Sequence, residues 1–256
     1  MDNKESVKRF WNKKPCGTFG VLENKPNLGY FESIRKRRYT LEPFIKVIVP
    51  FAELRNKKVL EIGCGVGTDG VEFIRSGADY VGVDASDISV GLAKRNVALL
   101  GFDSERVSLA DAERLPFPDN EFDFIYSWGV LHHTPDMEKA VSEVRRVLKP
   151  GGNFCIMLYN RFSLVGFQLY ILYGLLHLNP FVSFERLFSE HHESPGTKAL
   201  TDAEALKLFG DFKNVSVKNI VTPYDLRITR NIHWPLWFGK AIPQSLGFFK
   251  VIQGNR

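Results

Sequence analysis

A glycine-rich segment gives the first indication of chemistry in this sequence. Residues 61–70 read EIGCGVGTDG, and GVGTDG within them fits the G-x-G-x-x-G pattern of dinucleotide sites, with Asp84 at the distance expected of a ribose-binding acid. Glu61 and Asp69 would repel a pyrophosphate, whereas they would attract a ligand that carries an ammonium and a sulfonium. The segment therefore predicts a site for a cationic cofactor, with a nicotinamide-dependent dehydrogenase as the competing interpretation.

Two pairs of adjacent histidines are the next candidates for chemistry. His132 and His133 follow a predicted strand, at the edge where substrates meet cofactors in open α/β sheets. An imidazole can act as a general base near neutral pH. His191 and His192 lie in a later insertion and are candidate substrate contacts. No third ligand is tied to either pair by spacing, and the three cysteines are scattered, so no metal site is predicted.

Alternating strands and helices must position these residues. Helical spacing predicts helices at 68–76, 88–100, 137–148 and 201–209. Short apolar runs predict strands at 58–62, 80–84, 107–110, 122–127, 154–159, 215–221 and 248–252. Such alternation predicts an α/β fold with a mostly parallel sheet and helices on both faces.

Five segments resemble motifs of the class I S-adenosylmethionine-dependent methyltransferases, particularly the type 11 group around ubiquinone and menaquinone biosynthesis. These are VLEIGCGVG (59–67), GVDAS (82–86), ADAERLPFP (110–118), FDFIYSWGVLHH (122–133) and RVLKPGG (146–152). The resemblance implies S-adenosyl-L-methionine as cofactor and S-adenosyl-L-homocysteine as product. It also implies a Rossmann-like, doubly wound sheet of seven strands, mostly parallel, whose last strand is antiparallel.

The resemblance also implies which residues of this chain contact the cofactor. The loop glycines would leave room for the methionine moiety, Asp84 would accept hydrogen bonds from the ribose diol, and Asp111 would accept one from the adenine amino group. The complete set of expected cofactor contacts is Glu61, Gly63, Cys64, Gly65, Gly67, Asp84, Ala85, Ser86, Asp111, Ala112, Glu113, Ser127 and Trp128.

Methyl transfer from a sulfonium depends mainly on alignment of the reactants, and a base is needed only if the acceptor loses a proton. His133, and after it His132, are the candidate catalytic residues. Candidate acceptor contacts are Trp11, Arg37, Arg38, Tyr39, His191 and His192. In the family that this chain resembles, an Asn-Pro-Pro-Tyr motif marks methylation of planar nitrogens, and none follows the fourth predicted strand, so we expect methylation at oxygen. The basic and aromatic residues of the added segments favour a small-molecule acceptor that is acidic or aromatic. The alternatives are N- or C-methylation of a lipid, quinone-like or peptide substrate, and a non-catalytic cofactor-binding partner protein.

Charge is distributed unevenly along the 256 residues. The whole chain has 34 basic and 29 acidic side chains, of which residues 1–58 hold 14 and 6, a net of +8. The densest cluster is RKRR at 35–38, which either binds a carboxylate or phosphate of the acceptor or forms a solvated helix face. The formal net charge of the whole chain, +5, is too modest to indicate a nucleic-acid partner.

Four parts are expected: a basic N-terminal helical lid (1–42), the cofactor-binding core (43–160), an aromatic insertion that forms a substrate lid (161–200), and the rest of the core (201–256) with a second insertion at 222–247. Residues 162–184 contain no Asp, Glu, Lys or Arg, but glycines, polar residues and a proline interrupt them, so we expect a buried or lid helix without a transmembrane span. Peripheral membrane contact through this segment stays open. We expect a cytoplasmic protein, because no apolar leader precedes the core. We expect it to be a monomer or a homodimer.

Overall fold

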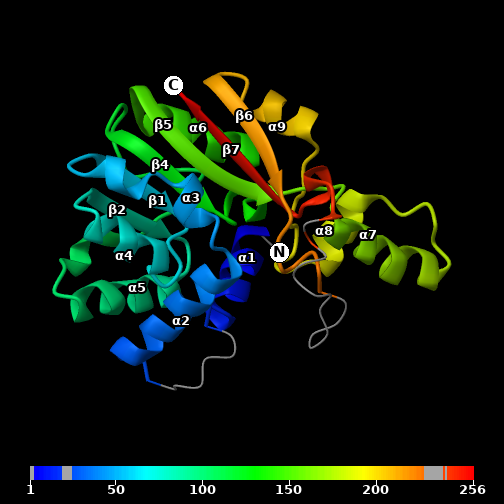
Figure 1. Ribbon diagram of the computed structural model, residues 1–256, viewed down its shortest axis with the longest axis horizontal. Helices are drawn as coiled ribbons and strands as arrows, with labels where there is room; N and C mark the ends of the chain where they lie inside the picture. The colour runs from blue at the N-terminus through cyan, green and yellow to red at the C-terminus, as the bar shows by residue number, and fades with distance from the viewer. Residues whose placement is uncertain (1–2, 19–24, 228–238, 240) are drawn as a thin grey trace.

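The computed structural model describes residues 3–18, 25–227, 239 and 241–256, and a twisted sheet forms its centre (Figure 1). The sheet has the order β3-β2-β1-β4-β5-β7-β6. Strands β1 to β5 are parallel to their neighbours, and β7 runs antiparallel to both β5 and β6. The strands are β1 (Lys58–Ile62), β2 (Asp79–Asp84), β3 (Val107–Leu109), β4 (Phe122–Trp128), β5 (Leu148–Tyr159), β6 (Lys213–Ile220) and β7 (Phe249–Asn255). The expected mostly parallel sheet of seven strands with an antiparallel last strand is confirmed.

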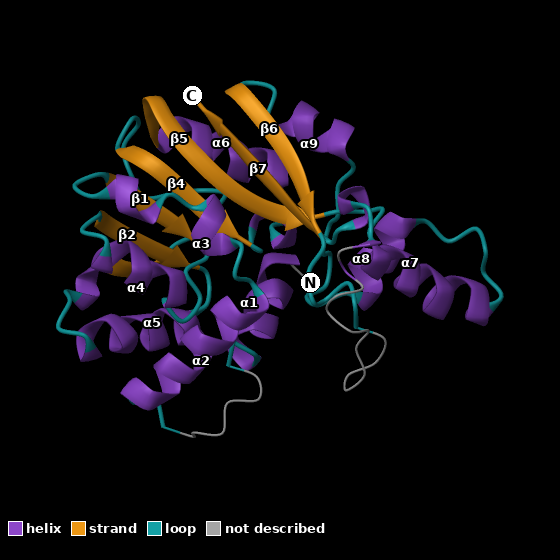
Figure 2. Ribbon diagram, in the orientation of Figure 1, coloured by secondary structure: helices purple, strands orange, loops and turns teal. Residues whose placement is uncertain are grey.

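Helices cover both faces of the sheet (Figure 2). Helices α4 (Thr68–Arg75) and α5 (Asp87–Leu99) pack on one face, where side chains such as Val59 and Tyr126 point toward Phe73 of α4. Helices α6 (Met137–Val147) and α9 (Asp202–Leu208) pack on the other face, against residues such as Leu60 and Ile125. The strands are apolar on both sides because both faces are covered.

Local signals account for most element boundaries. Thr201 caps α9 with a capping box in which Glu204 is the reciprocal partner. The fifth strand departs from expectation, because it begins at Leu148 instead of residue 154. Leu148 pairs with Phe122, and the register shifts before the pairing resumes at Asn153, so the Pro-Gly-Gly segment lies inside an irregular strand.

Three helices precede the sheet: α1 (Asn3–Lys13), α2 (Leu28–Leu41) and α3 (Ile45–Ile48). Asn27 caps α2 by accepting a hydrogen bond from the backbone N–H of Tyr30. Phe31 and Ile34 of α2 are buried against Val66, so this helix packs on the loop that follows β1. Short 3-10 helices occur at Phe51–Leu54, Ser104–Arg106, Leu131–His133 and Gln244–Leu246.

The insertion after β5 projects from the edge of the sheet, away from α4 and α5 (Figure 1). It contains α7 (Leu164–Leu169), a π-helical turn (Tyr170–Gly174), a 3-10 turn (Leu175–His177) and α8 (Phe184–His191). The buried or lid helix expected at 162–184 forms only in part: the segment is helical from residue 164 to 177 and stops before Leu178, which has a left-handed φ of 56° and is followed shortly by Pro180. None of the described helices is long and apolar enough to cross a bilayer. Much of the insertion expected at 222–247 lies outside the described residues.

Candidate functional site

A cavity of about 1160 Å³ lies at the carboxyl ends of the central strands. Residues that end or follow β1, β2, β4 and β5 form its floor, and the strand order reverses between β1 and β4 at this place. Helices α1 and α2 line one side, and the insertion after β5 lines another. In open α/β sheets, ligands bind outside the carboxyl ends of the strands at such a switch point.

The three loop glycines have different structural reasons to be glycine. All have positive φ, at 78° for Gly63, 53° for Gly65 and 76° for Gly67. A Cβ at Gly63 would lie 2.1 Å from Val130 Cγ2, and one at Gly67 would lie 3.3 Å from Ala93 Cβ. A Cβ at Gly65 would meet no atom within 4 Å. Gly63 and Gly65 line the cavity and Gly67 does not, so the loop exposes its backbone to the cavity at Gly65.

Asp84 ties this loop to the end of β2. Its Oδ2 accepts a hydrogen bond of 2.9 Å from the backbone N–H of Gly65, and its Oδ1 accepts one of 2.8 Å from the backbone N–H of Ser86. Burial raises the pKa of Asp84 above its usual value, although these N–H groups oppose the shift. The carboxyl group also lines the cavity. Asp84 is thus placed both to fix the loop and to meet a ligand.

Helix α1 lies across the ends of β2 and β3. Lys4 Nζ contacts Asp111 Oδ2 at 2.7 Å and also pairs with Glu113. Ser86 Oγ donates a 2.7 Å hydrogen bond to Asn12 Oδ1. The side chains expected to meet the ribose and adenine therefore lie beneath α1, which covers this part of the cavity as the expected N-terminal lid would.

Arg38 binds two buried carboxylates beside the cavity. Its guanidinium lies 2.7 Å from Asp69 Oδ2 and 3.1 Å from Glu42 Oε1. The hydroxyl groups of Tyr39 and Tyr126 donate to Asp69 at 2.8 and 2.9 Å. Arg38 and Tyr39 are thus engaged with Asp69, and Tyr39 does not line the cavity.

Glu61 and Asp69, near the glycine-rich loop, offer less uncompensated negative charge to a ligand than the sequence predicts. Arg38 balances Asp69. Burial raises the pKa of Glu61 well above its usual value, and Tyr80 donates a 2.6 Å hydrogen bond to it. Electrostatic attraction for a cationic ligand therefore rests less on Glu61 and Asp69 than their position in the sequence suggests.

The indole of Trp128 and the hydroxyl of Ser127, at the end of β4, both form hydrogen bonds within the protein. Trp128 lines the cavity, and its Nε1 donates a 2.8 Å hydrogen bond to Glu42. Ser127 is fully buried, does not line the cavity, and donates a 2.9 Å hydrogen bond to the carbonyl of Ile62. Ser127 therefore supports the loop after β1 from within the sheet.

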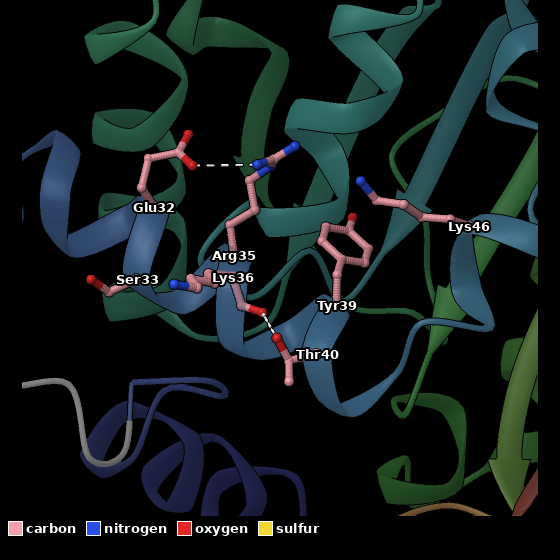
Figure 3. Close-up of a pocket in the computed structure, with 7 residues that line it drawn as sticks. All are labelled: Glu32, Ser33, Arg35, Lys36, Tyr39, Thr40 and Lys46. Atoms are coloured by element: carbon pink, nitrogen blue, oxygen red, sulfur yellow. Dashed lines mark hydrogen bonds and ion pairs between the residues drawn. The ribbon is translucent and has the colours of Figure 1, made fainter.

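The basic cluster of α2 divides between two sites. Arg37 and Arg38 line the cavity. Arg35 and Lys36 line a separate pocket with Tyr39 and Lys46, shown in Figure 3, in which Arg35 contacts Glu32. Arg35 Nε also lies 2.6 Å from Glu72 Oε1. Only the second half of the cluster can therefore reach a ligand in the cavity.

His133 lines the cavity within a cluster of polar side chains. Its Nδ1 lies 2.9 Å from Ser194 Oγ and 3.1 Å from Thr197 Oγ1. Its Nε2 lies 3.3 Å from Glu193 Oε2, which also accepts a 2.7 Å hydrogen bond from the hydroxyl of Tyr159. The Trp11 ring packs edge-on against the His133 ring at 5.1 Å.

The other three histidines of the predicted set differ in their surroundings. His132 is fully buried, packs against the Tyr159 ring at 3.8 Å and does not line the cavity. Burial lowers the pKa of His132 and of His192. His191 stacks on Tyr173 at 3.9 Å, and both His191 and His192 line the cavity. His133 is therefore the better placed of the two candidate bases.

Sequence reasoning missed Glu193, Tyr159, Glu42 and Lys4 as parts of the site. Glu193 directly follows the His191–His192 pair, and a carboxylate beside two imidazoles is a signal that could have drawn attention to it. Tyr159 ends β5, at the same edge of the sheet as His133. Glu42 and Lys4 have no comparable local signal, because helix packing brings them to the cavity.

Comparison with known proteins identifies the central segment. Residues 60–156 match the family model of a methyltransferase domain. Sterol 24-C-methyltransferase ERG6B of Gibberella zeae is 40% identical over 38% of this chain and 26% of its own length. Fatty-acid O-methyltransferase of Mycolicibacterium smegmatis is 31% identical over 53% of this chain and 49% of its own length. The chain thus spans about a quarter to a half of these relatives.

Solved structures share the fold over the full chain. Geranyl diphosphate C-methyltransferase from Streptomyces coelicolor A3(2), in complex with Mg²⁺, geranyl diphosphate and S-adenosyl-L-homocysteine, matches with a TM-score of 0.66 and 15% identity, over 100% of this chain and 98% of that one. A putative methyltransferase in complex with the Haloferax volcanii Trm112 activator matches with a TM-score of 0.63 and 17% identity, over 98% and 97% of the two chains. The resemblance to class I methyltransferases is confirmed.

Proposed function

We propose that this chain, which contains a class I S-adenosylmethionine-dependent methyltransferase domain, transfers a methyl group to an oxygen of a small-molecule acceptor. One observation carries the proposal: a single cavity brings the exposed backbone at Gly65 and the carboxyl group of Asp84 together with His133. The first two suit a nucleoside-containing methyl donor. The histidine suits an acceptor that must lose a proton.

The loop after β1 passes a simple test of fit for S-adenosylmethionine. The open space beside Gly65 leaves room for a ligand against the backbone. Asp84 can accept hydrogen bonds from a ribose diol, and Asp111 with the neighbouring backbone can meet adenine. When bound, this cofactor supplies an electrophilic methyl group on a sulfonium. The chain's own contribution is to orient the two reactants and to keep water out, which α1 and the insertion after β5 favour by covering the cavity.

His133 is arranged to take a proton at Nε2. The Thr197 hydroxyl donates its single proton to the Ser194 carbonyl at 2.6 Å, so it can only accept from His133. In the tautomer that carries the imidazole proton on Nδ1, Nε2 presents a lone pair. Glu193, 3.3 Å from Nε2, would stabilise the imidazolium formed when the acceptor gives up its proton.

The lining of the acceptor side favours an apolar acceptor. Trp11, Val165, Leu172 and Phe248 contribute apolar surface there. Sterols and fatty acids are the acceptors named for two of the relatives, which supports this choice of class for the present chain. A fatty or aromatic acceptor with a hydroxyl group combines an apolar body with an oxygen that His133 can deprotonate, whereas a carboxyl group is already ionised near pH 7 and needs no base.

Binding and turnover test the proposal separately. In calorimetry we expect S-adenosyl-L-homocysteine to bind and NAD not to bind. With labelled methyl donor, we expect transfer to hydroxyl- or carboxyl-bearing apolar acceptors. Binding of NAD alone would support the dehydrogenase interpretation. Binding of S-adenosyl-L-homocysteine without transfer to any acceptor in the panel would support a non-catalytic cofactor-binding protein.

His133→Ala tests the role of the base. We expect kcat to fall by roughly 10²–10⁴-fold, because a positioned general base contributes about that much, while S-adenosyl-L-homocysteine binds as in the wild type. His177→Ala is the matched control, because His177 is an exposed histidine of the insertion after β5 that does not line the cavity. Equal rates for the wild type and His133→Ala would remove the base from the mechanism and leave alignment alone.

A further inference from the structure

Several imidazole nitrogens of the histidines beside the acceptor side of the cavity have no hydrogen-bond partner. Among the described residues, the buried side-chain atoms that lack a hydrogen-bond partner include both ring nitrogens of His132 and the Nε2 atoms of His133 and His192. His132 itself is fully buried. An unpartnered buried polar atom costs roughly 1–3 kcal/mol, so several of them in one place call for a common partner.

We propose that His132, His133 and Glu193 bind a divalent transition-metal cation of the Zn²⁺ type. One nitrogen from each histidine and one carboxylate oxygen of Glu193 lie within 4.8 Å of one another. Ligand atoms around a tetrahedral zinc ion lie about 3.4 Å apart, given bond lengths near 2.1 Å. Small side-chain adjustments of about 1 Å would bring the three atoms to that spacing.

The surroundings of His133 orient it as a metal ligand. In the tautomer in which its Nδ1 donates toward the hydroxyl oxygens of Ser194 and Thr197, the ring is fixed and Nε2 is unprotonated. Such a hydrogen bond from the second ring nitrogen is typical of metal-binding histidines. The Nε2 lone pair then faces the Glu193 carboxylate at 3.3 Å, and two lone-pair groups that face each other require a proton or a cation between them.

The donor set selects the type of metal. Imidazole suits Zn²⁺ and similar transition cations, whereas Mg²⁺ and Ca²⁺ prefer oxygen ligands. Three protein ligands leave at least one coordination position free. His133 and Glu193 line the cavity, so that position faces the acceptor side. The sequence predicted no metal because Glu193 is 60 residues beyond His133, and only the fold brings it to the histidines.

Metal binding would also alter the proposed catalytic role of His133, and this consequence alone rests on the proposed function. A cation at Nε2 occupies the lone pair that would take the acceptor's proton. We therefore expect Zn²⁺ to lower the rate with acceptors that need deprotonation by His133. The binding measurements below use neither cofactor nor acceptor, so they succeed or fail independently of the methyltransferase assignment.

Titration of the full chain with Zn²⁺ against a chromophoric chelator tests the site. We expect one equivalent to bind with micromolar affinity or tighter, and Mg²⁺ not to compete. Glu193→Gln and His133→Ala should each weaken Zn²⁺ binding by roughly 100-fold or more. His177→Ala should bind as the wild type does. Co²⁺ should show the visible absorption of a bound, low-symmetry site in the wild type and lose it in Glu193→Gln.

Three results would overturn the proposal. The first is no Zn²⁺ binding by the wild type at millimolar concentration. The second is equal affinity in the wild type and the Glu193→Gln variant, with both shown to be folded by circular dichroism. The third is an equal loss of affinity in His177→Ala and His133→Ala, which would assign the ion to the protein surface.

Discussion

The two halves of the cavity are built in different ways. Strand ends, backbone N–H groups and the carboxyl group of Asp84 form the half expected to hold the cofactor. Trp11 of α1, side chains of α2 and the insertion after β5 form the acceptor half, with the cluster around His133 at its centre, whereas Lys4 and Asn12 of α1 lie over the cofactor half. The first half depends on short segments whose geometry is local. The second depends on side chains brought together from distant parts of the chain, and it can differ between proteins while the first stays the same.

Removing Arg38 should have the largest effect, because this residue supports the wall beside both halves. In Arg38→Met, the buried carboxylates of Asp69 and Glu42 lose their cation, and unpaired buried charges cost about 3–5 kcal/mol. We expect that loss in the free energy of unfolding measured in urea. Arg106→Met, which breaks an exposed pair with Asp79, should cost less than about 1 kcal/mol. Similar values for the two variants would contradict the structural role given to Arg38.

Asp84→Ala should separate the cofactor half from the acceptor half. The loss of a charge-assisted contact to the ribose and of the support for Gly65 should weaken S-adenosyl-L-homocysteine binding by roughly 100-fold, or about 3 kcal/mol. Asp79→Ala is the control, because Asp79 begins the same strand and is exposed. Calorimetry on the folded variants decides between them. Unchanged affinity for S-adenosyl-L-homocysteine in Asp84→Ala would contradict the assignment of Asp84 to the ribose. Zn²⁺ should bind to this variant as it does to the wild type, because the proposed metal site lies in the acceptor half.

Acid titration should reveal the ionised Glu193 of the acceptor half. Its pKa is lowered to about 2 in the folded chain, so it stabilises the fold above the ordinary glutamate value of about 4.3, and this stabilisation is lost as the pH falls toward 2. Because 37% of the side chain is exposed, we expect an effect of about 1 kcal/mol. The stability of Glu193→Gln should decline less between pH 4.5 and 2. Glu190→Gln, which alters an exposed pair with Arg186, should follow the wild type.

The smallest effect concerns the outer surface of the acceptor half. Leu176, Leu178 and Phe181 are 69%, 91% and 96% exposed, so contact with a lipid surface stays a prediction for this segment. Leu176→Asp should lower binding to anionic vesicles several-fold in sedimentation, because partial insertion of one leucine contributes only a fraction of the roughly 1.5–3 kcal/mol of full burial. Val47→Asp controls for the loss of an exposed apolar residue, since Val47 is 86% exposed on α3. No vesicle binding by the wild type would end this prediction.

The sequence predicts the cofactor half of the cavity better than the acceptor half. The strand at 58–62, the glycine turn and the acid at the end of β2 could be placed because each depends on a few adjacent residues. The capped helix after Thr201 was predictable for the same reason. The irregular start of β5 was not, because its pairing with Phe122 compensates for a Pro-Gly-Gly segment that normally ends a strand.

For the acceptor half, the sequence identified candidate residues but not their interaction partners. Arg38 and Tyr39 stood out by their charge and ring, yet their partners Asp69 and Glu42 depend on how α2 packs against the loop after β1. The partnership of His133 with Glu193 needs the chain to leave β5, form α7 and α8, and return. Hydrophobic periodicity reports which residues are buried, but it does not specify which polar groups meet across such a distance.

Helix α1 has a consequence for the timing of turnover. Its Lys4 is paired with Asp111 and Glu113, its Asn12 with Ser86, and its Trp11 packs on His133. A product bound beside Asp84 and Asp111 would lie beneath α1, so we expect detachment of α1 to contribute to its dwell time. Salt screens the half-exposed Lys4 contacts, and higher ionic strength should therefore speed product release while leaving the chemical step unchanged.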